Sequence, residues 1–111
     1  MKTVNLKEGM PLVRQALMQM ERELAVARAE GSGLVKLIHG YGSTGAGGEI
    51  RLAVQKRLRE MSERGEIRGF IFGENWAKSD EQTWKIIGAR KELKEDRDLG
   101  KGNRGITVVE L

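Results

Sequence analysis

The sequence contains no cysteine, which excludes disulfide bonds and thiolate metal sites. A lack of cysteine also fits a reducing compartment. The chain has a single histidine, His39, and one histidine without cysteine cannot build a zinc site. We therefore expect no cofactor, and a divalent metal held by carboxylates would enter only if the chain were a nuclease.

Long apolar runs are absent as well. No stretch approaches the ~18 consecutive apolar residues that a membrane-spanning helix requires. The first residues, MKTVNLKEGMPLV, carry charges at Lys7 and Glu8 and no sustained apolar run, so we expect no signal peptide. From these absences we expect a cytoplasmic protein without membrane contacts.

Acidic side chains are slightly outnumbered by basic ones. The 111 residues are enough for one domain, 1–111, and the net charge is +4 at pH 7. The excess of Lys and Arg lies in residues 1–73, because residues 74–111 carry eight basic and eight acidic side chains. A basic balance allows binding to phosphate backbones, although it also serves solubility alone.

Apolar periodicity predicts strands that alternate with helices. Apolar residues at steps of three and four predict a helix that follows Pro11 and runs to about Ala29. A second apolar stripe predicts a helix after the glycines at 40–48. Strands are predicted at 3–6, 34–38, 67–72 and 105–111. This order indicates one α/β domain with a sheet of about four strands.

A third helical segment is predicted before the last strand. The sequence SDEQ at 79–82 is a capping-box pattern, in which Ser79 and Gln82 satisfy open backbone amides. The segment that follows contains Trp84, Ile87 and Leu93. Trp76 and Trp84 could stack on bases, but such residues more often anchor an inserted segment onto the core. The run at 90–104 is mixed in sign, which predicts a solvated face.

A glycine-rich loop joins the second predicted strand to the second helix. Gly40, Gly42 and Gly45 spell the G-x-G-x-x-G pattern of dinucleotide-binding loops. Two further glycines precede the helix, and the acidic residue expected ~20 positions later falls in a helix rather than at a strand end. A dinucleotide site is therefore disfavoured, and no Gly-Lys-Ser/Thr follows to make a Walker loop.

The junction between the same loop and the helix could also bind an anion. A helix N-terminus exposes backbone N–H groups beside the positive end of the helix dipole, which suits an anion. Arg51 lies in the first turn and could add a cation there, whereas Glu49 would oppose phosphate unless it caps the helix. His39 ends the strand at the edge where α/β sheets gather ligands. There are two alternatives. The glycines could form a mobile turn without binding anything, and His39 could form a hydrogen bond to a loop carbonyl without any further role.

Residues 35–61 resemble the core of the small MutS-related (Smr) domain. They read VKLIHGYGS, then TGA, then GGEIRLAVQKRLREM. Members of that family have a strand ending in His-Gly-x-Gly, then a glycine, a Leu/Ile-Arg pair and an amphipathic helix. The segment NRGITVVEL at 103–111 is similar to the family's closing glycine and strand, so the resemblance spans nearly the whole chain. The residues that match the first motif are His39, Gly40, Gly42, Gly48, Ile50 and Arg51.

The resemblance implies a fold and a partner. The fold is a two-layer α/β sandwich with a four-stranded mixed sheet, similar to the C-terminal domain of translation initiation factor three. A helical insertion at about 78–101 precedes the last strand. The resemblance also implies binding to DNA or RNA through the His-Gly-x-Gly loop, and several members are nicking endonucleases. Repair factors or the ribosome are implied as further partners, and we expect a monomer.

Three departures from the family pattern affect the function. The family's first strand usually carries Leu-Asp-x-His, linked to nuclease activity, where this chain has Val4-Asn5-Leu6-Lys7. An amide does not titrate, and a lysine is a poor base at neutral pH unless its pKa is depressed. The glycine loop carries extra residues at 44–46, and the insertion at 78–101 is the third departure.

We therefore predict an Smr-like domain that engages nucleic-acid phosphates without strong catalysis. The alternatives are a structure-selective or nicking endonuclease that uses His39 as a catalytic residue, and a protein-interaction module. The residues predicted to contact nucleic acid are Lys7, His39, Gly40, Gly42, Gly48, Arg51 and Arg104.

Overall fold

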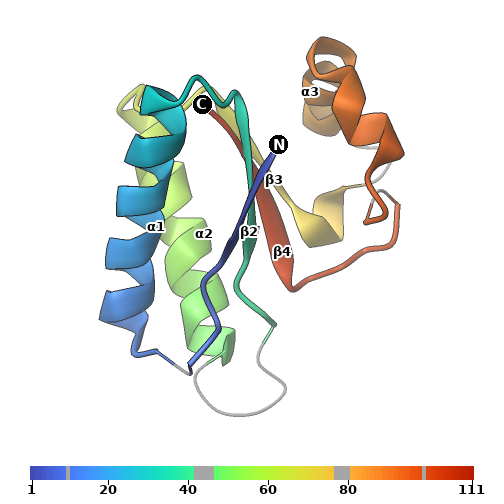
Figure 1. Cartoon of the computed structure of the whole chain (residues 1–111). Helices are drawn as coiled ribbons and strands as arrows, with labels where there is room; N and C mark the ends of the chain where they lie inside the picture. Colours follow the sequence, from blue (N-terminus) through green and yellow to red (C-terminus); the bar gives the residue numbers. More distant parts are fainter. Residues whose placement is uncertain (10, 42–46, 77–80, 99) are drawn as a thin grey trace.

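A computed structural model describes residues 1–9, 11–41, 47–76, 81–98 and 100–111 (Figure 1). Four strands form one sheet, and their bounds are β1 (Lys2–Asn5), β2 (Leu34–Ile38), β3 (Gly69–Phe72) and β4 (Ile106–Glu110). The helical elements are α1 (Val13–Ala29), α2 (Gly47–Glu63), η1 (Gly73–Asn75), α3 (Glu81–Ala89) and η2 (Lys91–Glu95). The predicted alternation of strands and helices is confirmed, with ends that differ by one to a few residues.

The sheet is mixed, with the strand order β1-β2-β4-β3. β1 pairs with β2 in parallel, whereas β4 lies antiparallel to both of its neighbours, β2 and β3. Helices α1 and α2 cover one face of the sheet, and α3 lies beyond the other face (Figure 1). The predicted two-layer α/β core with a four-stranded mixed sheet is confirmed, and the segment before β4 adds cover on the second face.

Alternation along β2 divides the apolar residues between the two faces. Val35 and Leu37 belong to the core beneath α1 and α2, whereas Leu34 and Ile38 pack with the α3 side. Since both faces are covered, the central strands β2 and β4 are buried along most of their length, as their continuous apolar runs require. The predicted stripe of α2 is buried in the first core and consists of Ile50, Val54, Leu58 and Met61.

The segment between β3 and β4 differs from its predicted form. The third helix ends at Ala89, and Leu93 lies in the separate element η2, where it is buried. Trp76 is 0% exposed and anchors this segment in the second core, as predicted for one role of the tryptophans. Trp84 does not, because it is 49% exposed while its neighbours Ile86 and Ile87 are buried. Ser79 of the capping-box pattern lies outside the described residues.

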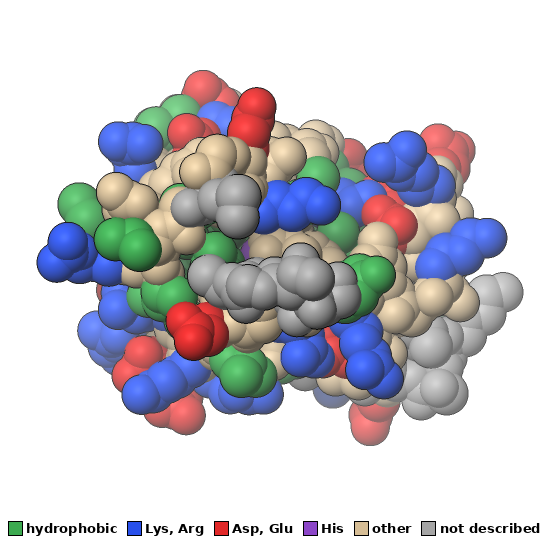
Figure 2. Space-filling model, turned by 90° about the horizontal axis from the view of Figure 1, so that it is seen from below, with side chains coloured by type: hydrophobic (Ala, Val, Ile, Leu, Met, Phe, Trp, Pro, Cys, Tyr) green, Lys and Arg blue, Asp and Glu red, His purple; other side chains and the backbone are tan. Residues whose placement is uncertain are grey.

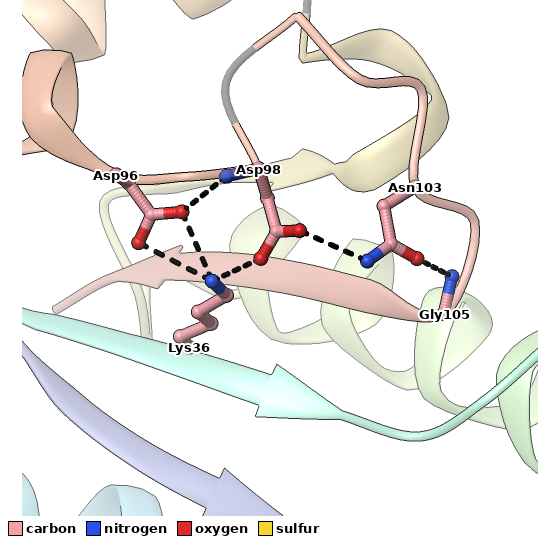
Figure 3. A network of polar contacts seen from close by, with 5 residues as sticks. All are labelled: Lys36, Asp96, Asp98, Asn103 and Gly105. Carbon is pink, nitrogen blue, oxygen red and sulfur yellow. Dashed lines mark hydrogen bonds and ion pairs between the residues drawn. The ribbon is translucent and has the colours of Figure 1, made fainter.

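A buried lysine on β2 holds the chain that leads into β4 (Figure 3). The Lys36 ammonium donates to Asp96 Oδ1 at 2.9 Å and also forms an ion pair with Asp98. Asp98 in turn accepts a hydrogen bond from the Asn103 amide at 3.1 Å. The Lys36 side chain is 8% exposed, and its ammonium lies 6.0 Å from the centre of the Trp76 ring. The prediction that residues 90–104 form a solvated face is therefore wrong at Asp96 and Asp98.

The charges in this cluster stabilise one another. Burial alone would lower the pKa of Lys36, but the hydrogen bonds to Asp98 and Asp96 outweigh it and raise that pKa above its ordinary value. Burial would likewise raise the pKa of Asp98, yet the bond from Lys36 lowers it.

Within the described residues, no helix is long and apolar enough to cross a membrane.

Replacing Lys36 tests this cluster. Lys36→Met leaves two buried carboxylates without their cation, so we expect the free energy of unfolding to fall by about 3 kcal/mol. Urea unfolding at pH 7 measures the loss. Lys85→Met removes an exposed cation of α3 whose Glu81 partner is 4.0 Å away, and it should change stability by less than about 0.5 kcal/mol. Equal losses in the two variants would contradict the role given to Lys36.

Candidate nucleic-acid interface

The residues predicted to bind nucleic acid lie at one end of the sheet. β1 and β2 end there, and because β4 is antiparallel to β2, it begins there. The helix α2 also begins at this end, which is the lower end in Figure 1. Figure 2 looks onto this surface, where Lys and Arg side chains are more prominent than Asp and Glu. The topology therefore brings together segments that are up to 100 positions apart in the chain.

Backbone hydrogen bonds of Gly105 join the end of β2 to the start of β4. Its carbonyl accepts hydrogen bonds from the backbone N–H groups of His39 and Gly40, each at 3.0 Å. Its own N–H donates to Asn103 Oδ1 at 2.8 Å. Gly40 has φ of +74°, a left-handed conformation that glycine adopts without strain, and it turns the chain out of β2. This arrangement sets the direction in which the loop leaves the sheet.

His39 lies beneath this turn and is 0% exposed. Its Nδ1 is 2.7 Å from the Gly40 carbonyl, and its Nε2 is 2.9 Å from the Thr107 hydroxyl. A carbonyl can only accept, so Nδ1 carries the proton, and in a neutral ring Nε2 then accepts from Thr107. Both ring nitrogens are thus used within the protein, and the side chain connects β2 to β4.

Burial lowers the pKa of His39 below its ordinary value. The hydrogen bond to the Gly40 carbonyl opposes this effect, whereas the nearby positive charge of Arg51 adds to it. The imidazole is therefore neutral at physiological pH, in agreement with the hydrogen-bond pattern.

Asn5 and Lys7 occupy the turn after β1. The Asn5 side-chain oxygen accepts the backbone N–H groups of Lys7 and Glu8, both at 3.0 Å, which is an Asx turn. The exposed Lys7 side chain runs past Gly40, since a Cβ built on that glycine would lie 3.5 Å from Lys7 Cδ. The Asn5 amide thus shapes the turn, and the Lys7 side chain lies beside Gly40.

Arg51 is already paired. Its guanidinium forms an ion pair with Glu74 of η1, and Gln55, one helical turn further along α2, donates to the same carboxylate at 3.2 Å. Burial alone would raise the pKa of Glu74, but hydrogen bonds from its backbone, Arg51 and Gln55 lower it. The Arg51 side chain is 22% exposed and its Nε is buried without a partner. Arg51 therefore connects α2 to the end of β3.

The remaining predicted residues have different surroundings. Gly48 is half-buried in the first turn of α2, and Arg104 is exposed immediately before Gly105. Gly42 and the extra loop residues at 44–46 lie outside the described residues. The end of the sheet thus brings Lys7, His39, Gly40 and Arg104 around Gly105, while Arg51 is held toward η1.

Sequence reasoning missed the residues that hold the predicted ones in place. Glu74 follows the third strand at the same end of the sheet as Arg51, so strand order and charge could have indicated the pair. Asn103 lies in a Gly-Asn-Arg-Gly turn, where Asn commonly bonds to the backbone. Thr107 gave no such indication, since threonine is common in strands for packing alone.

The described part of the chain holds no group of three or more His, Asp or Glu residues placed to bind a metal ion. A surface hollow of about 510 Å³ lies between Arg68, Lys85 and Glu110. Another of about 510 Å³ lies beside Lys36 and reaches Asn103 and Ile106 near the Gly105 turn. An extended polymer can bind across an open face, so the site requires no enclosed pocket.

The pH dependence of stability tests the environment of His39. Because its pKa is lowered in the folded state, the unfolded chain takes up a proton near pH 6.5 while the folded chain does not. The contribution of His39 to the free energy of unfolding is therefore fully present above about pH 6.5. It falls as the pH decreases, by at most about 1.4 kcal/mol per pH unit, until the pKa of His39 in the folded state is reached.

In the variant His39→Gln, urea unfolding between about pH 7 and pH 5 should show a smaller decline than in the native protein. Since His39 is the only histidine, the difference between the two curves isolates its contribution. Parallel curves would show that His39 titrates normally in the folded protein.

No protein-family model and no curated protein matches the chain. Among solved structures, the chain is similar to the crystal structure of the Smr domain of Thermus thermophilus MutS2. The TM-score is 0.62 and the sequence identity is 24%, and the match covers 100% of this chain and 98% of that one. The chain has the fold of an Smr domain along its whole length.

Proposed function

We propose that residues 1–111 form one Smr-like domain, with an insertion at 78–101, that binds DNA or RNA through phosphate contacts at the Gly105 end of the sheet. Lys7 and Arg104 are the main cations of this interface. The first backbone N–H groups of α2, at and after Gly48, supply further donors. The fold shared with the Smr domain of Thermus thermophilus MutS2 supports this assignment.

The observation that carries the proposal is the state of these two cations. Lys7 and Arg104 are exposed, and neither side chain forms an ion pair with any described residue. They flank the Gly40–Gly105 contact from two different segments of the chain. Cations without acidic partners attract phosphates and release counterions when they bind them.

Arg51 has a different role in this proposal. Its ion pair with Glu74 offsets its charge, so a phosphate would have to compete with a carboxylate already in place. We assign Arg51 a positioning role, in which it fixes the start of α2 relative to β3. The N-terminal turn of that helix then keeps its direction toward the interface.

The geometry favours binding over catalysis. A general base needs a free lone pair within reach of a substrate proton. The His39 ring is buried and its nitrogens are bonded to Gly40 and Thr107. Asn5, in the position of the family's carboxylate, bonds to the backbone of its own turn. We therefore propose binding without cleavage and give His39 the role of holding the interface from beneath.

Salt dependence tests the proposed interface. The logarithm of the affinity for a labelled oligonucleotide should fall linearly with the logarithm of the salt concentration. Lys7→Met and Arg104→Met should each weaken binding by about three- to tenfold. Each should also reduce the slope by about 0.7 for a single strand or 0.9 for a duplex, because one phosphate contact is lost. Fluorescence anisotropy at several salt concentrations measures both quantities.

The matched control is Lys91→Met, which removes an exposed cation next to Glu92. Glu92 is 3.5 Å from the N-terminal amine, so this control lies near the opposite end of β1 from Lys7. It should leave affinity and slope nearly unchanged. If all three variants behave alike, binding depends on net charge and the proposed interface is wrong.

A further inference from the structure

We infer that Tyr41 is a base-stacking residue, and that the interface selects nucleic acid with unpaired bases. This inference rests on the proposed function and adds the class of nucleic acid that the interface takes. Tyr41 is the only tyrosine in the chain and is 59% exposed, directly after the Gly40 turn. Neither the fold nor the phosphate contacts account for an aromatic ring that projects at this position.

The ring of Tyr41 lies beside the contact between Gly40 and Gly105. A Cβ built on Gly105 would be 3.1 Å from Asn103 Oδ1, 3.5 Å from Tyr41 Cδ1 and 3.5 Å from the Cα of Gly40. A Cβ built on Gly40 would be 3.5 Å from Lys7 Cδ. Gly105 is buried and Gly40 is half-buried, so the exposed side chains of Tyr41 and Lys7 lie close to the same pair of glycines.

The backbone beneath the ring is held before any ligand arrives. The N–H of Gly40 donates to the Gly105 carbonyl, and the carbonyl of Gly40 accepts from His39 Nδ1. The backbone N–H and the carbonyl of Gly40, the residue before Tyr41, are thus both hydrogen-bonded within the protein. A ring on a fixed backbone has only two side-chain torsions to order when it binds, so little conformational entropy is lost.

The pairing of an exposed ring with a cation matches the chemistry of a single strand. Each base has an aromatic face that can stack on a tyrosine, while the phosphate next to it can contact a lysine. In a duplex the bases stack on one another, so their faces are covered except at the ends. Tyr41 and Lys7 together therefore fit one nucleotide of an unpaired segment.

An abasic probe separates stacking from phosphate contacts. The test compares an oligo-dT of about 12 nucleotides, a size within the usual range for single-strand binding, with an abasic strand of the same length and charge. A duplex of the same length is the third probe. The native protein should bind oligo-dT about tenfold more tightly than the abasic strand, because only oligo-dT offers bases for stacking.

Two variants and a control complete the test. Tyr41→Ala should remove the preference for oligo-dT over the abasic strand and leave the salt slope unchanged, since no charge is lost. Tyr41→Phe should keep the preference, because it keeps the ring. Trp84→Ala removes another exposed aromatic, on α3, and should have no effect. Urea unfolding of each variant confirms that it is folded.

Each outcome separates this inference from the proposed function. Equal affinity of the native protein for oligo-dT and the abasic strand, or tighter binding of the duplex, would overturn the stacking role and leave phosphate binding standing. A preference that survives in Tyr41→Ala would also overturn it. Failure of all three probes to bind at low salt would overturn the proposed function itself.

Discussion

The arrangement of the interface depends on the backbone N–H and carbonyl groups of Gly105. Its carbonyl receives the N–H groups of His39 and Gly40, and its N–H is bonded to Asn103. The position lacks a side chain, which leaves room for Asn103 Oδ1, 3.1 Å from where a Cβ would lie. These bonds extend the pairing of β2 with β4 beyond Ile38 and Ile106 and give the exposed side chains around them a common frame.

The buried charged cluster of Lys36, Asp96 and Asp98 is connected to the backbone of Gly105 through Asn103 (Figure 3). Lys36 bonds to Asp96 and Asp98, Asp98 accepts from Asn103, and Asn103 accepts from Gly105. A continuous series of polar contacts thus runs from the middle of β2 to the interface. Lys36 is thus paired with carboxylates, whereas Lys7 and Arg104 beside the glycines form no ion pair with a described residue. We therefore expect the contacts of Lys36 with Asp96 and Asp98 to affect binding through the position of β4.

Local patterns in the sequence predicted most of the elements, because periodicity reports which face each one buries. The bounds of β2 and the buried stripe of α2 agree with prediction for this reason. The prediction that Leu93 belongs to the third helix is wrong, because apolar spacing alone does not show that this helix ends at Ala89. The pair Lys36–Asp98 could not be predicted from local pattern, because it joins distant segments through the packed fold. The pair Arg51–Glu74 requires the strand order in addition to the charges. The same limit hid the burial of His39.

Amide chemical shifts of the labelled protein test the location of binding most directly. On addition of a single-stranded oligonucleotide at low salt, we predict that the shifts of Lys7, Gly40, Tyr41 and Gly105 change together and saturate with one affinity. The amides of α3 and η2 should stay unchanged, because these elements lie beyond the other face of the sheet. Changes centred on α3, or no saturable change at the Gly105 end, would contradict the account.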